Sequence, residues 1–571
     1  MLLILAVFWP RLSYPLLEPD EARNAQIALE MYQSGDWVSL TRKGRPYMDK
    51  PPLLFWSIST CYRLFGPSPF AARLPVALAA TLTVLVTYLL GTSLVGTRAA
   101  LWGTVVLATS IGFILPGRYI IHDMFLTFFV TCTLSLLWLA EALPRSVARS
   151  ICWAAAGVAC GLGTLTKGPV AVVLTVPPLL LFDWLKWGKL RSRISEWGLF
   201  AGALIVTAAP WYVLATLRNK QFLEYFVWKQ NISRFLHGSN HPAPWWFYIP
   251  VVFAGMFPAS LLLPPAAVYL FTRRRVFRER RPATLGFVFL AACWPLLFFS
   301  LSGGKLPTYI LPAAPLLSLL IGQMIHSVLV PAGPLATRQL PLYLKDVRLH
   351  FPTVLLALSV TAVPVCLGID FALGQLRFSN GLLLSAFTLV LSTLWVVDRR
   401  WWIRRPVRWG LAAGAAVVAV SVVFNDVFPN VAVCRSYLAH TAERVAAVPA
   451  LAHNRSVPLV FFGRDRDSAA LYFPGRPIQE LKSNDFDRLI SFLEAHPQVV
   501  LVAEPHDTRK VKRRLQNLPF QIQPLSDCVL WIRRAETDST TKSAFRSRLS
   551  PFQRAHSEFK CSGRNNENRS A

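Results

Sequence analysis

Apolar runs long enough to cross a lipid bilayer recur from the start of the chain to about Phe428. A spanning helix needs roughly 20 such residues, and helices are favoured because hydrocarbon offers no partner to an unpaired backbone amide. The runs predict a polytopic α-helical membrane protein, with residues 1–428 forming a transmembrane domain of about thirteen helices. These helices are expected near residues 2–17, 71–95, 99–117, 120–140, 150–166, 168–185, 197–215, 248–271, 283–302, 307–330, 351–373, 378–397 and 409–428.

The basic residues indicate how these helices are oriented. The chain has 59 Lys and Arg against 30 Asp and Glu, a formal net charge of +29. If the first helix runs outward, the basic clusters of the short connections, such as 273–281 and 399–408, all fall on the cytoplasmic side. Because membrane proteins keep Lys and Arg inside, this basicity is a topology signal, and a nucleic-acid partner is not expected.

The same orientation places three parts of the chain on the outer side: loops 18–70 and 216–247, and everything after Phe428. In residues 429–534, short strand-like runs alternate with amphipathic helical segments, which predicts a small α/β domain. The strands are expected at 458–463, 499–503 and 528–532, and the helices at 486–496 and 507–518. The polar residues 535–571 are predicted to be a disordered tail.

A polar segment, Glu18–Pro52, stands out in this otherwise apolar chain. Charges are costly in a bilayer, so the segment is expected at the membrane surface or in a wet cavity. Asp20 is a good helix N-cap, and the residues up to Gln33 continue as an amphipathic helix that carries Glu21 and Arg23. Further on, Pro51 and Pro52 hold Asp49 and Lys50 at a rigid corner. Taken alone, Asp20 would only cap a helix, and Asp49 with Lys50 would only mark the membrane interface. Together in one loop, they favour a functional site.

Other charged residues fall on the same side. Asp123 lies at the outer end of a span, where a carboxylate must be paired or wet. Arg234, His237 and His241 precede an aromatic belt, and Lys305 and Tyr309 follow a Gly-Gly pair between two spans. Lys50, Arg234 and Lys305 converging on one cavity would suit a phosphate or pyrophosphate. Lys167 either joins them or is a charge in a short turn, and each histidine alone reads as a solvated loop residue.

Several of these motifs carry a family resemblance. DEARNAQIALEM, GDW and DKPP in the polar segment, then RYIIHDMFLTFF, SRFLHGSNHPAPWWFY and FFSLSGGKLPTYILPAAPLLSLL, resemble the bacterial 4-amino-4-deoxy-L-arabinose lipid A transferase family. The chain is also similar, more distantly, to protein O-mannosyltransferases. The resemblance covers about residues 15–330.

The resemblance implies a GT-C membrane glycosyltransferase, a helical bundle in the bacterial inner membrane with a periplasmic α/β domain and an active site facing the periplasm. It implies that Asp20, with Glu21 beside it, and Asp123 are the catalytic carboxylates. By the same resemblance, Lys50 and Arg234 match contacts to the donor phosphate, Tyr309 matches a residue that lines the same cavity, and Arg23 is the neighbour of Asp20 on the helix. Together with Asp49 and Lys305, these residues are the expected donor and substrate contacts. The family also links the position of Asp49 to a divalent metal, for which His237 and His241 are the candidate partners.

The expected function is therefore inverting transfer of a sugar, aminoarabinose or another pentose or hexose, from an undecaprenyl (polyprenyl) phosphate donor. The acceptor is lipid A or another envelope glycan or protein. Cations would stabilise the departing phosphate, and Asp20 could take a proton from a hydroxyl acceptor. The alternatives are protein O-mannosyl transfer and a lipid-linked sugar transporter or flippase. A transporter is disfavoured because the ionisable residues gather at helix ends and no repeated half is visible.

Overall fold

The computed structural model describes residues 7–237, 241–329, 342–372, 405–463, 467, 469–516, 518, 520–526 and 528–534. The chain divides into two compact units. The first comprises Met1–Glu443 with Arg466–Pro474, and the second comprises Arg444–Asp465 with Gly475–Ala571.

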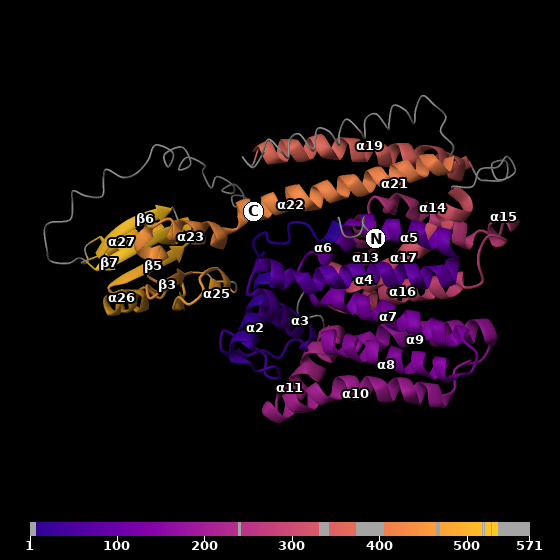
Figure 1. The fold of residues 1–571 in the computed structure, drawn as a ribbon, viewed down its shortest axis with the longest axis horizontal. Coiled ribbons are helices and arrows are strands. Elements are labelled where there is room, and N and C mark those ends of the chain that lie inside the picture. The colour runs from indigo at the N-terminus through magenta and orange to yellow at the C-terminus, as the bar shows by residue number, and fades with distance from the viewer. Residues whose placement is uncertain are drawn as a thin grey trace. The chain divides into compact units, whose positions relative to one another are not determined.

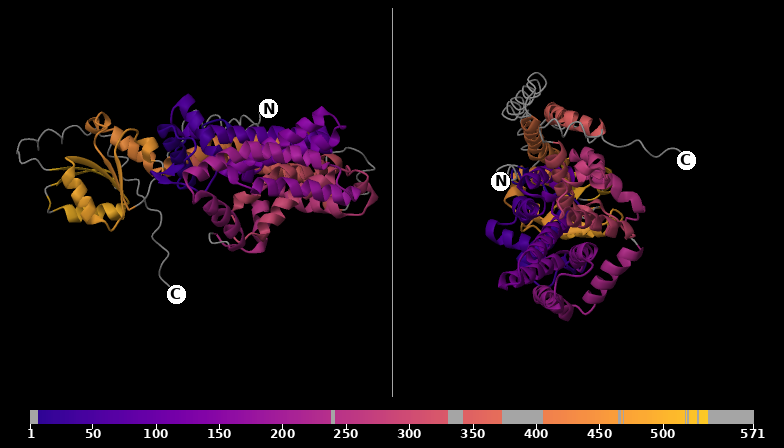
Figure 2. Two further views of the ribbon diagram at one scale, coloured as in Figure 1. Left: turned by 90° about the horizontal axis from the view of Figure 1, so that it is seen from below. Right: turned by 90° about the vertical axis from the view of Figure 1, so that its right-hand side faces the viewer.

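The first unit is a bundle of long apolar helices that run alongside one another in Figure 1 and are seen end-on in the right-hand view of Figure 2. Among the described residues, seven helices are long and apolar enough to cross a membrane. They are α4 (Pro69–Val95), α7 (His122–Ala142), α8 (Val147–Lys167), α9 (Val170–Trp187), α10 (Ile194–Arg218), the segment Pro307–Val328 and the segment Trp409–Val433. Pro307–Val328 is built from η4 (Pro307–Ala313), α17 (Ala314–Met324) and η5 (Ile325–Leu329), and the last segment from α21 (Arg405–Val422), η6 (Val423–Val427) and α22 (Phe428–Arg435).

Two bent helix pairs raise the possible number of spans to nine. α5 (Thr97–Thr109) meets α6 (Ile111–Gly117) at 65°, and the pair Trp245–Gly255 and Ala259–Phe271 is bent by 112°. The second pair contains η2 (Trp245–Phe247), α13 (Tyr248–Gly255), η3 (Ala259–Leu262) and α14 (Leu263–Phe271). The chain is thus a multi-pass membrane protein by the length and composition of its helices.

The predicted number of thirteen spans is higher than the described residues support. α16 (Leu285–Leu301) has only 17 residues. α19 (Leu342–Ala372) covers residues 351–372 of the predicted span 351–373, and the continuous apolar stretch whose side chains the structure describes is His350–Ala362. Of the predicted span 2–17, residues 9–17 form turns and irregular backbone, and residues 2–6 lie outside the described part. The predicted span 378–397 also lies outside it. An apolar run shows that a segment avoids water, but not that it forms one straight helix.

Small residues allow the helices of the bundle to approach closely. A Cβ atom added to Gly322 of α17 would lie 2.3 Å from the backbone nitrogen of Gly103 in α5, and one added to Gly157 of α8 would lie 2.3 Å from the carbonyl oxygen of Phe200 in α10. Membrane helices associate through this kind of close van der Waals packing, because lipid supplies no hydrophobic drive between them.

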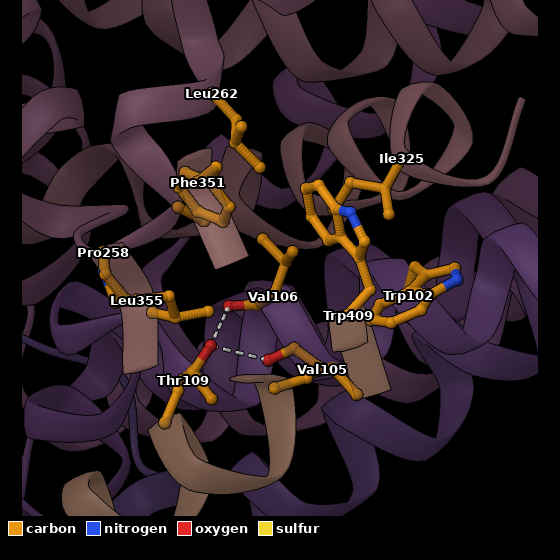
Figure 3. A pocket seen from close by; sticks show the side chains of 13 residues that line it. Trp102, Val105, Val106, Thr109, Pro258, Leu262, Ile325, Phe351, Leu355 and Trp409 are labelled. Carbon is orange, nitrogen blue, oxygen red and sulfur yellow. Dashed lines mark hydrogen bonds between the residues drawn. The ribbon is translucent and has the colours of Figure 1, made fainter. Parts of the chain in front are cut away.

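Aromatic side chains pack α19 and α21 against α5 (Figure 3). Trp409 stacks on Phe351, with 5.5 Å between ring centroids, and meets the edge of Trp102 at 6.1 Å. They surround a cavity of about 30 Å³ in which the Thr109 hydroxyl turns back to the carbonyl oxygens of Val105 and Val106. The lining is otherwise apolar, so this cavity belongs to the packing of the bundle.

The polar segment folds at one end of the bundle as α2 (Asp20–Ser34), the hairpin β1 (Thr41–Arg42) and β2 (Arg45–Pro46), and α3 (Leu53–Phe65) (Figure 1). The prediction that Asp20 caps α2 is wrong. Pro19 occupies the cap position without a side-chain hydrogen bond, and Asp20 lies in the first turn. Gly35 ends the helix with φ of 71°, a conformation that favours glycine.

The second outer loop, predicted at 216–247, is largely helical. It contains α11 (Phe222–Glu224), the π-helix η1 (Tyr225–Ser233) and α12 (Arg234–His237). The remaining helices of the first unit are α15 (Arg275–Arg278) near the start of α16, and α25 (Ala469–Tyr472). α23 (Tyr437–Ala446) crosses from the first unit into the second.

The second unit contains a five-stranded sheet in the order β4-β3-β5-β7-β6. Its elements are α24 (Pro449–Ala452), β3 (Leu459–Phe462), β4 (Ile478–Leu481), α26 (Phe486–Ala495), β5 (Gln498–Ala503), α27 (Pro505–Leu515), β6 (Phe520–Ser526) and β7 (Val529–Arg534). β4, β3 and β5 are parallel, whereas β7 pairs antiparallel with both β5 and β6. The three predicted strands coincide with β3, β5 and β7, and the two predicted helices with α26 and α27.

Two edge strands and the domain boundary differ from the predictions. β4 and β6 are the edges of the sheet, and their sequences IQEL and FQIQPLS mix polar residues into the apolar pattern on which strand prediction depends. The second unit begins at Arg444 and not at 429, because α22 continues the last helix of the bundle beyond Phe428. The predicted tail, 535–571, lies outside the described residues.

Candidate functional site

A buried ion pair fixes the start of α2. The Glu21 carboxylate accepts two hydrogen bonds from Arg73 of α4, at 2.9 and 2.6 Å, and further bonds from the amides of Leu17 and Ile120. The side chains of Glu21 and Arg73 are both fully buried. Removing one member would leave an uncompensated buried charge, which costs about 3–5 kcal/mol. Glu21, predicted to be catalytic, therefore positions α2 and has no free carboxylate oxygen to offer a substrate.

Asp20 and Arg23 lie on the open side of α2. They form an ion pair at 2.5 Å, and the Asp20 side chain is 48% exposed. Both charges act on the phenol of Tyr47, as does Asp49, although burial is the main cause of the raised pKa of Tyr47. The accessible carboxylate of Asp20 thus lies near the corner that carries Asp49 and Lys50.

The proline corner turns Asp49 and Lys50 in different directions. Asp49 accepts hydrogen bonds from the Tyr225 hydroxyl at 2.8 Å and from Gln230 Nε2 at 2.6 Å, both on η1. Lys50 instead lines a cavity. α3 begins at Leu53, directly after the two prolines, as the predicted rigid corner requires.

The cavity lined by Lys50 has a volume of about 290 Å³ and joins a cationic wall to an apolar wall. The cationic wall is formed by Lys50, Lys167 and Arg234. Ser302, Gly304 and Tyr309, from the loop and helix that follow α16, also line it. The apolar wall consists of Val170 and Val173 of α9, Ile232 of η1, Phe235 and Leu236 of α12, and Phe298 and Phe299 of α16.

Asp123 supports this cavity from behind. One of its carboxylate oxygens pairs with the Lys167 ammonium, and the other accepts a hydrogen bond from the Thr308 hydroxyl at 3.2 Å. The same ammonium lies 4.1 Å from the centre of the Tyr309 ring. The sequence predicts that Asp123 is either paired or wet, and in the structure its partner is Lys167.

The three cations influence each other's protonation. Burial, together with the positive charges of Lys167 and Arg234, lowers the pKa of Lys50 to about 7, while Asp123 and Asp49 act in the opposite direction. Among the described residues, only Lys167 of these three cations is paired with a carboxylate at the cavity, and such a cluster favours an anionic ligand.

Lys305 and His241 do not line the cavity. The Lys305 ammonium donates to the carbonyl oxygens of Ala243, at 2.9 Å, and of Ser302, so it fastens two loops together and does not face a phosphate. His241 is exposed with φ of 60°, and the side chain of His237 lies outside the described part of the structure. Among the described residues, no group of three or more His, Cys, Asp or Glu side chains could hold a metal ion.

Three polar residues of this region were not singled out as site residues in the sequence. Tyr225, Gln230 and Asn231 all lie on η1, where the polar residues and apolar residues alternate too irregularly to predict a helix face. The π-helical geometry, which often marks functional sites, is visible only in the structure. Lys167 could have been ranked higher, because the predicted topology already placed it on the outer side.

The fold is that of a known class of membrane protein. Over 94% of this chain and 97% of the other, it superposes on the crystal structure of ArnT from Cupriavidus metallidurans bound to undecaprenyl phosphate, with a TM-score of 0.68 and 22% sequence identity. The apo state of the same protein matches equally well, at 0.68 and 21% identity.

Sequence comparisons point to the same class. Residues 11–226 match the family model described as dolichyl-phosphate-mannose-protein mannosyltransferase. The undecaprenyl phosphate-alpha-4-amino-4-deoxy-L-arabinose arabinosyl transferase 1 of Pseudomonas fluorescens is 36% identical over 320 residues, 55% of this chain and 55% of that protein. The corresponding transferase of Erwinia tasmaniensis is 36% identical over 315 residues, 53% of this chain and 55% of that protein.

These matches confirm the resemblance to GT-C glycosyltransferases of the arabinosyl and mannosyl transferase type. The sequence match spans about half the length of the relatives.

Proposed function

We propose that this protein is a glycosyltransferase that moves a sugar from a polyprenyl-phosphate donor to lipid A or another envelope acceptor. The 290 Å³ cavity is the observation that carries the proposal, because its two walls complement the two halves of such a donor. Lys50, Lys167 and Arg234 suit the phosphate, and the valines and phenylalanines beside them suit the first isoprene units.

The relatives make undecaprenyl phosphate and aminoarabinose the first candidates for carrier and sugar. The most similar sequences carry the names of undecaprenyl phosphate-aminoarabinose transferases, and the ArnT structure was solved with undecaprenyl phosphate. The basic clusters indicate that the other end of the bundle lies in the cytoplasm. The cavity would therefore face the periplasm from the inner membrane, and the α/β unit would lie on that same side.

In the proposed reaction, the acceptor oxygen attacks the anomeric carbon as the bond to the phosphate oxygen breaks, with inversion. The cations stabilise the negative charge that develops on the leaving phosphate. Lys167 is held in place for this by Asp123 and by the face of Tyr309. Asp20, the accessible carboxylate, would accept the proton of a hydroxyl acceptor, whereas a phosphate acceptor such as that of lipid A needs no base.

Among the described residues, Asp49 belongs to no group of three or more His, Cys, Asp or Glu side chains that could hold a metal ion. Tyr225 and Gln230 both donate hydrogen bonds to Asp49 Oδ1, and His241 is exposed to solvent. The proposed reaction uses side chains alone. Because the His237 side chain is not described, the metal stays a prediction, and loss of transfer on chelation with recovery on adding Zn²⁺ or Mg²⁺ would support it.

The proposal is tested with the purified protein in lipid nanodiscs. Undecaprenyl phosphate-aminoarabinose and lipid A are supplied, and mass spectrometry follows the mass of the acceptor. We expect the wild-type protein to add one aminoarabinose residue, and the Lys50→Ala variant to add it far more slowly. Absence of transfer from this donor and from polyprenyl-phosphate hexoses, by a folded protein, would overturn it.

A further inference from the structure

A second cationic cavity lies at the opposite end of the bundle from the proposed active site. α4 starts at Pro69, beside the polar segment, and ends at Val95, which lines this second cavity; α16 starts beside it and ends at the first cavity. The second cavity has a volume of about 510 Å³ and is lined by Val95, Glu279, Arg280, Arg281, Pro282, Gln323, His326 and Ser327.

The turn that carries the two arginines is firmly built. The Arg280 carbonyl oxygen accepts hydrogen bonds from Tyr269 and from Gln323 Nε2, both at 3.1 Å, and the Arg280 guanidinium donates to the carbonyl oxygen of Ser327 at 2.8 Å. Arg281 donates to the carbonyl oxygen of Thr272 at 2.5 Å and lies 5.6 Å from the centre of the Tyr269 ring. The cations are thus held at the mouth of a defined hollow.

Both arginines are partly exposed, so each can offer donors to a ligand in the cavity. The hydrogen bonds to the carbonyl oxygens of Ser327 and Thr272 engage one terminal nitrogen of each guanidinium. The rim carboxylate of Glu279 is exposed and paired with Arg275 at 2.6 Å, which weakens its repulsion of an anion.

We propose that this cavity binds the headgroup of an anionic phospholipid, with the phosphate on Arg280 and Arg281. Basic hollows between membrane helices at the positively charged end of a bundle are suited to phospholipid headgroups. The N–H donors of a guanidinium form a planar fork that matches the oxygens of a phosphate. This site is independent of the proposed transferase reaction.

The test uses the full-length protein in phosphatidylcholine nanodiscs that contain a small fraction of labelled phosphatidylglycerol. Retention of the labelled lipid is measured by native mass spectrometry. We expect the Arg280→Gln/Arg281→Gln variant to retain about tenfold less than the wild type. The matched control, Arg273→Gln/Arg274→Gln, removes the same charge from exposed positions outside the cavity and should retain as much as the wild type.

Further arms separate the possible ligands and do not depend on the double variant folding. In the wild type, labelled phosphatidylglycerol should be retained about tenfold more than labelled phosphatidylcholine at the same fraction, because the choline group carries a positive charge that the arginines repel. Equal losses in both double variants, or equal binding of both lipids by the wild type, would overturn the proposal. Displacement of the lipid by millimolar inorganic phosphate would assign the cavity to a soluble phosphate ligand and would also overturn it.

Discussion

Lys50 shows how neighbouring residues can be given different tasks by one rigid corner. Asp49 is held by two side chains of η1, whereas Lys50 faces the cavity with Lys167 and Arg234. A buried ammonium beside two other cations is poorly stabilised until an anion arrives. Burial, and then the repulsion of the two other cations, lowers the pKa of Lys50, and both effects are relieved when an anion such as phosphate binds.

The first prediction concerns the charge of Lys50. Lys50→Ala should lower the rate of sugar transfer by roughly 10²–10³, the usual cost of losing one group that stabilises a developing negative charge. The measurement is initial transfer rate at saturating acceptor. Lys229→Ala is the matched control, because Lys229 is an exposed cation on η1 that does not line the cavity. Equal losses in the two variants would contradict a specific role for Lys50.

The second prediction follows from the pKa of Lys50, about 7 in the empty site. A bound phosphate favours the charged ammonium, so binding takes up a proton once the pH exceeds about 7. The affinity for the donor should then fall as pH rises through 7, approaching about tenfold per pH unit. Lys50→Arg, which stays charged, should show no such fall between pH 7 and 9. The dissociation constant of undecaprenyl phosphate, measured for both proteins, decides between these outcomes, since titration of the ligand is common to both.

The third prediction concerns Asp123. Asp123→Asn would leave Lys167 without its counter-charge and should lower transfer by about 10²-fold, chiefly through a misplaced ammonium in the transition state. Thr308→Val removes only one hydrogen bond from the same carboxylate and should cost less than about tenfold. A similar loss in both variants would show that Asp123 does not act through Lys167.

For single residues, the sequence indicated which residues matter, but it did not show in which direction their side chains point. The sequence could single out Asp123, Lys50 and Arg234, because charged residues at the outer ends of membrane helices need a physical explanation. It could single out Tyr309 because this residue follows a Gly-Gly pair between two spans. Glu21 and Lys305 carried the same signal, but Glu21 pairs with Arg73, and Lys305 donates hydrogen bonds to carbonyl oxygens of two loops. Partners such as Arg73, 52 positions away from Glu21, are fixed by the three-dimensional fold and leave no local pattern.

At the scale of elements, helix packing depends on positions that carry no side chain. Gly322 lies so close to Gly103 that an added Cβ would meet backbone atoms, which cannot move aside as a flexible side chain can. This contact joins α17, which continues from the cavity residue Tyr309, to α5. Packing of the bundle and position of the site are therefore linked.

The fourth prediction tests that link. Gly322→Ala should destabilise the bundle by about 1–3 kcal/mol, the typical cost of overpacking, and lower the thermal denaturation midpoint in detergent by several degrees. Gly198→Ala in α10, where a Cβ would meet nothing within 4 Å, is the control and should leave the midpoint unchanged or slightly raised. Equal midpoints for the two variants would show that the α5–α17 contact is looser than described.

Elements were predictable from sequence wherever the apolar pattern was continuous. The long helices α4, α7, α8 and α10 begin and end within a few residues of the predicted runs. The prediction failed where a run hides a break: Ser110 separates α5 from α6, and the bend at Met256–Pro258 divides another run. The π-helix η1 was equally hidden, because its geometry follows from contacts with the polar segment.

At the scale of the whole molecule, the two cavities at opposite ends of the first unit bear on how the protein is oriented across the membrane. The first cavity combines cations with apolar walls beside the polar segment, and the second lies among the arginines of the 273–281 connection. If the positive-inside bias places the arginine end in the cytoplasm, the proposed active site opens to the periplasm.

The fifth prediction measures this orientation. In a variant that lacks the nine native cysteines, a single cysteine at the exposed position of Ser34 in α2 should react with a membrane-impermeant thiol reagent added to intact spheroplasts. A single cysteine at the exposed position of Lys189, in the turn after α9, should react only after the membrane is ruptured. The two positions are matched in exposure, so unequal labelling reports sidedness and not accessibility within the fold. The reverse pattern would turn the first cavity toward the cytoplasm, where a lipid A acceptor exposed on the periplasmic face could not reach it.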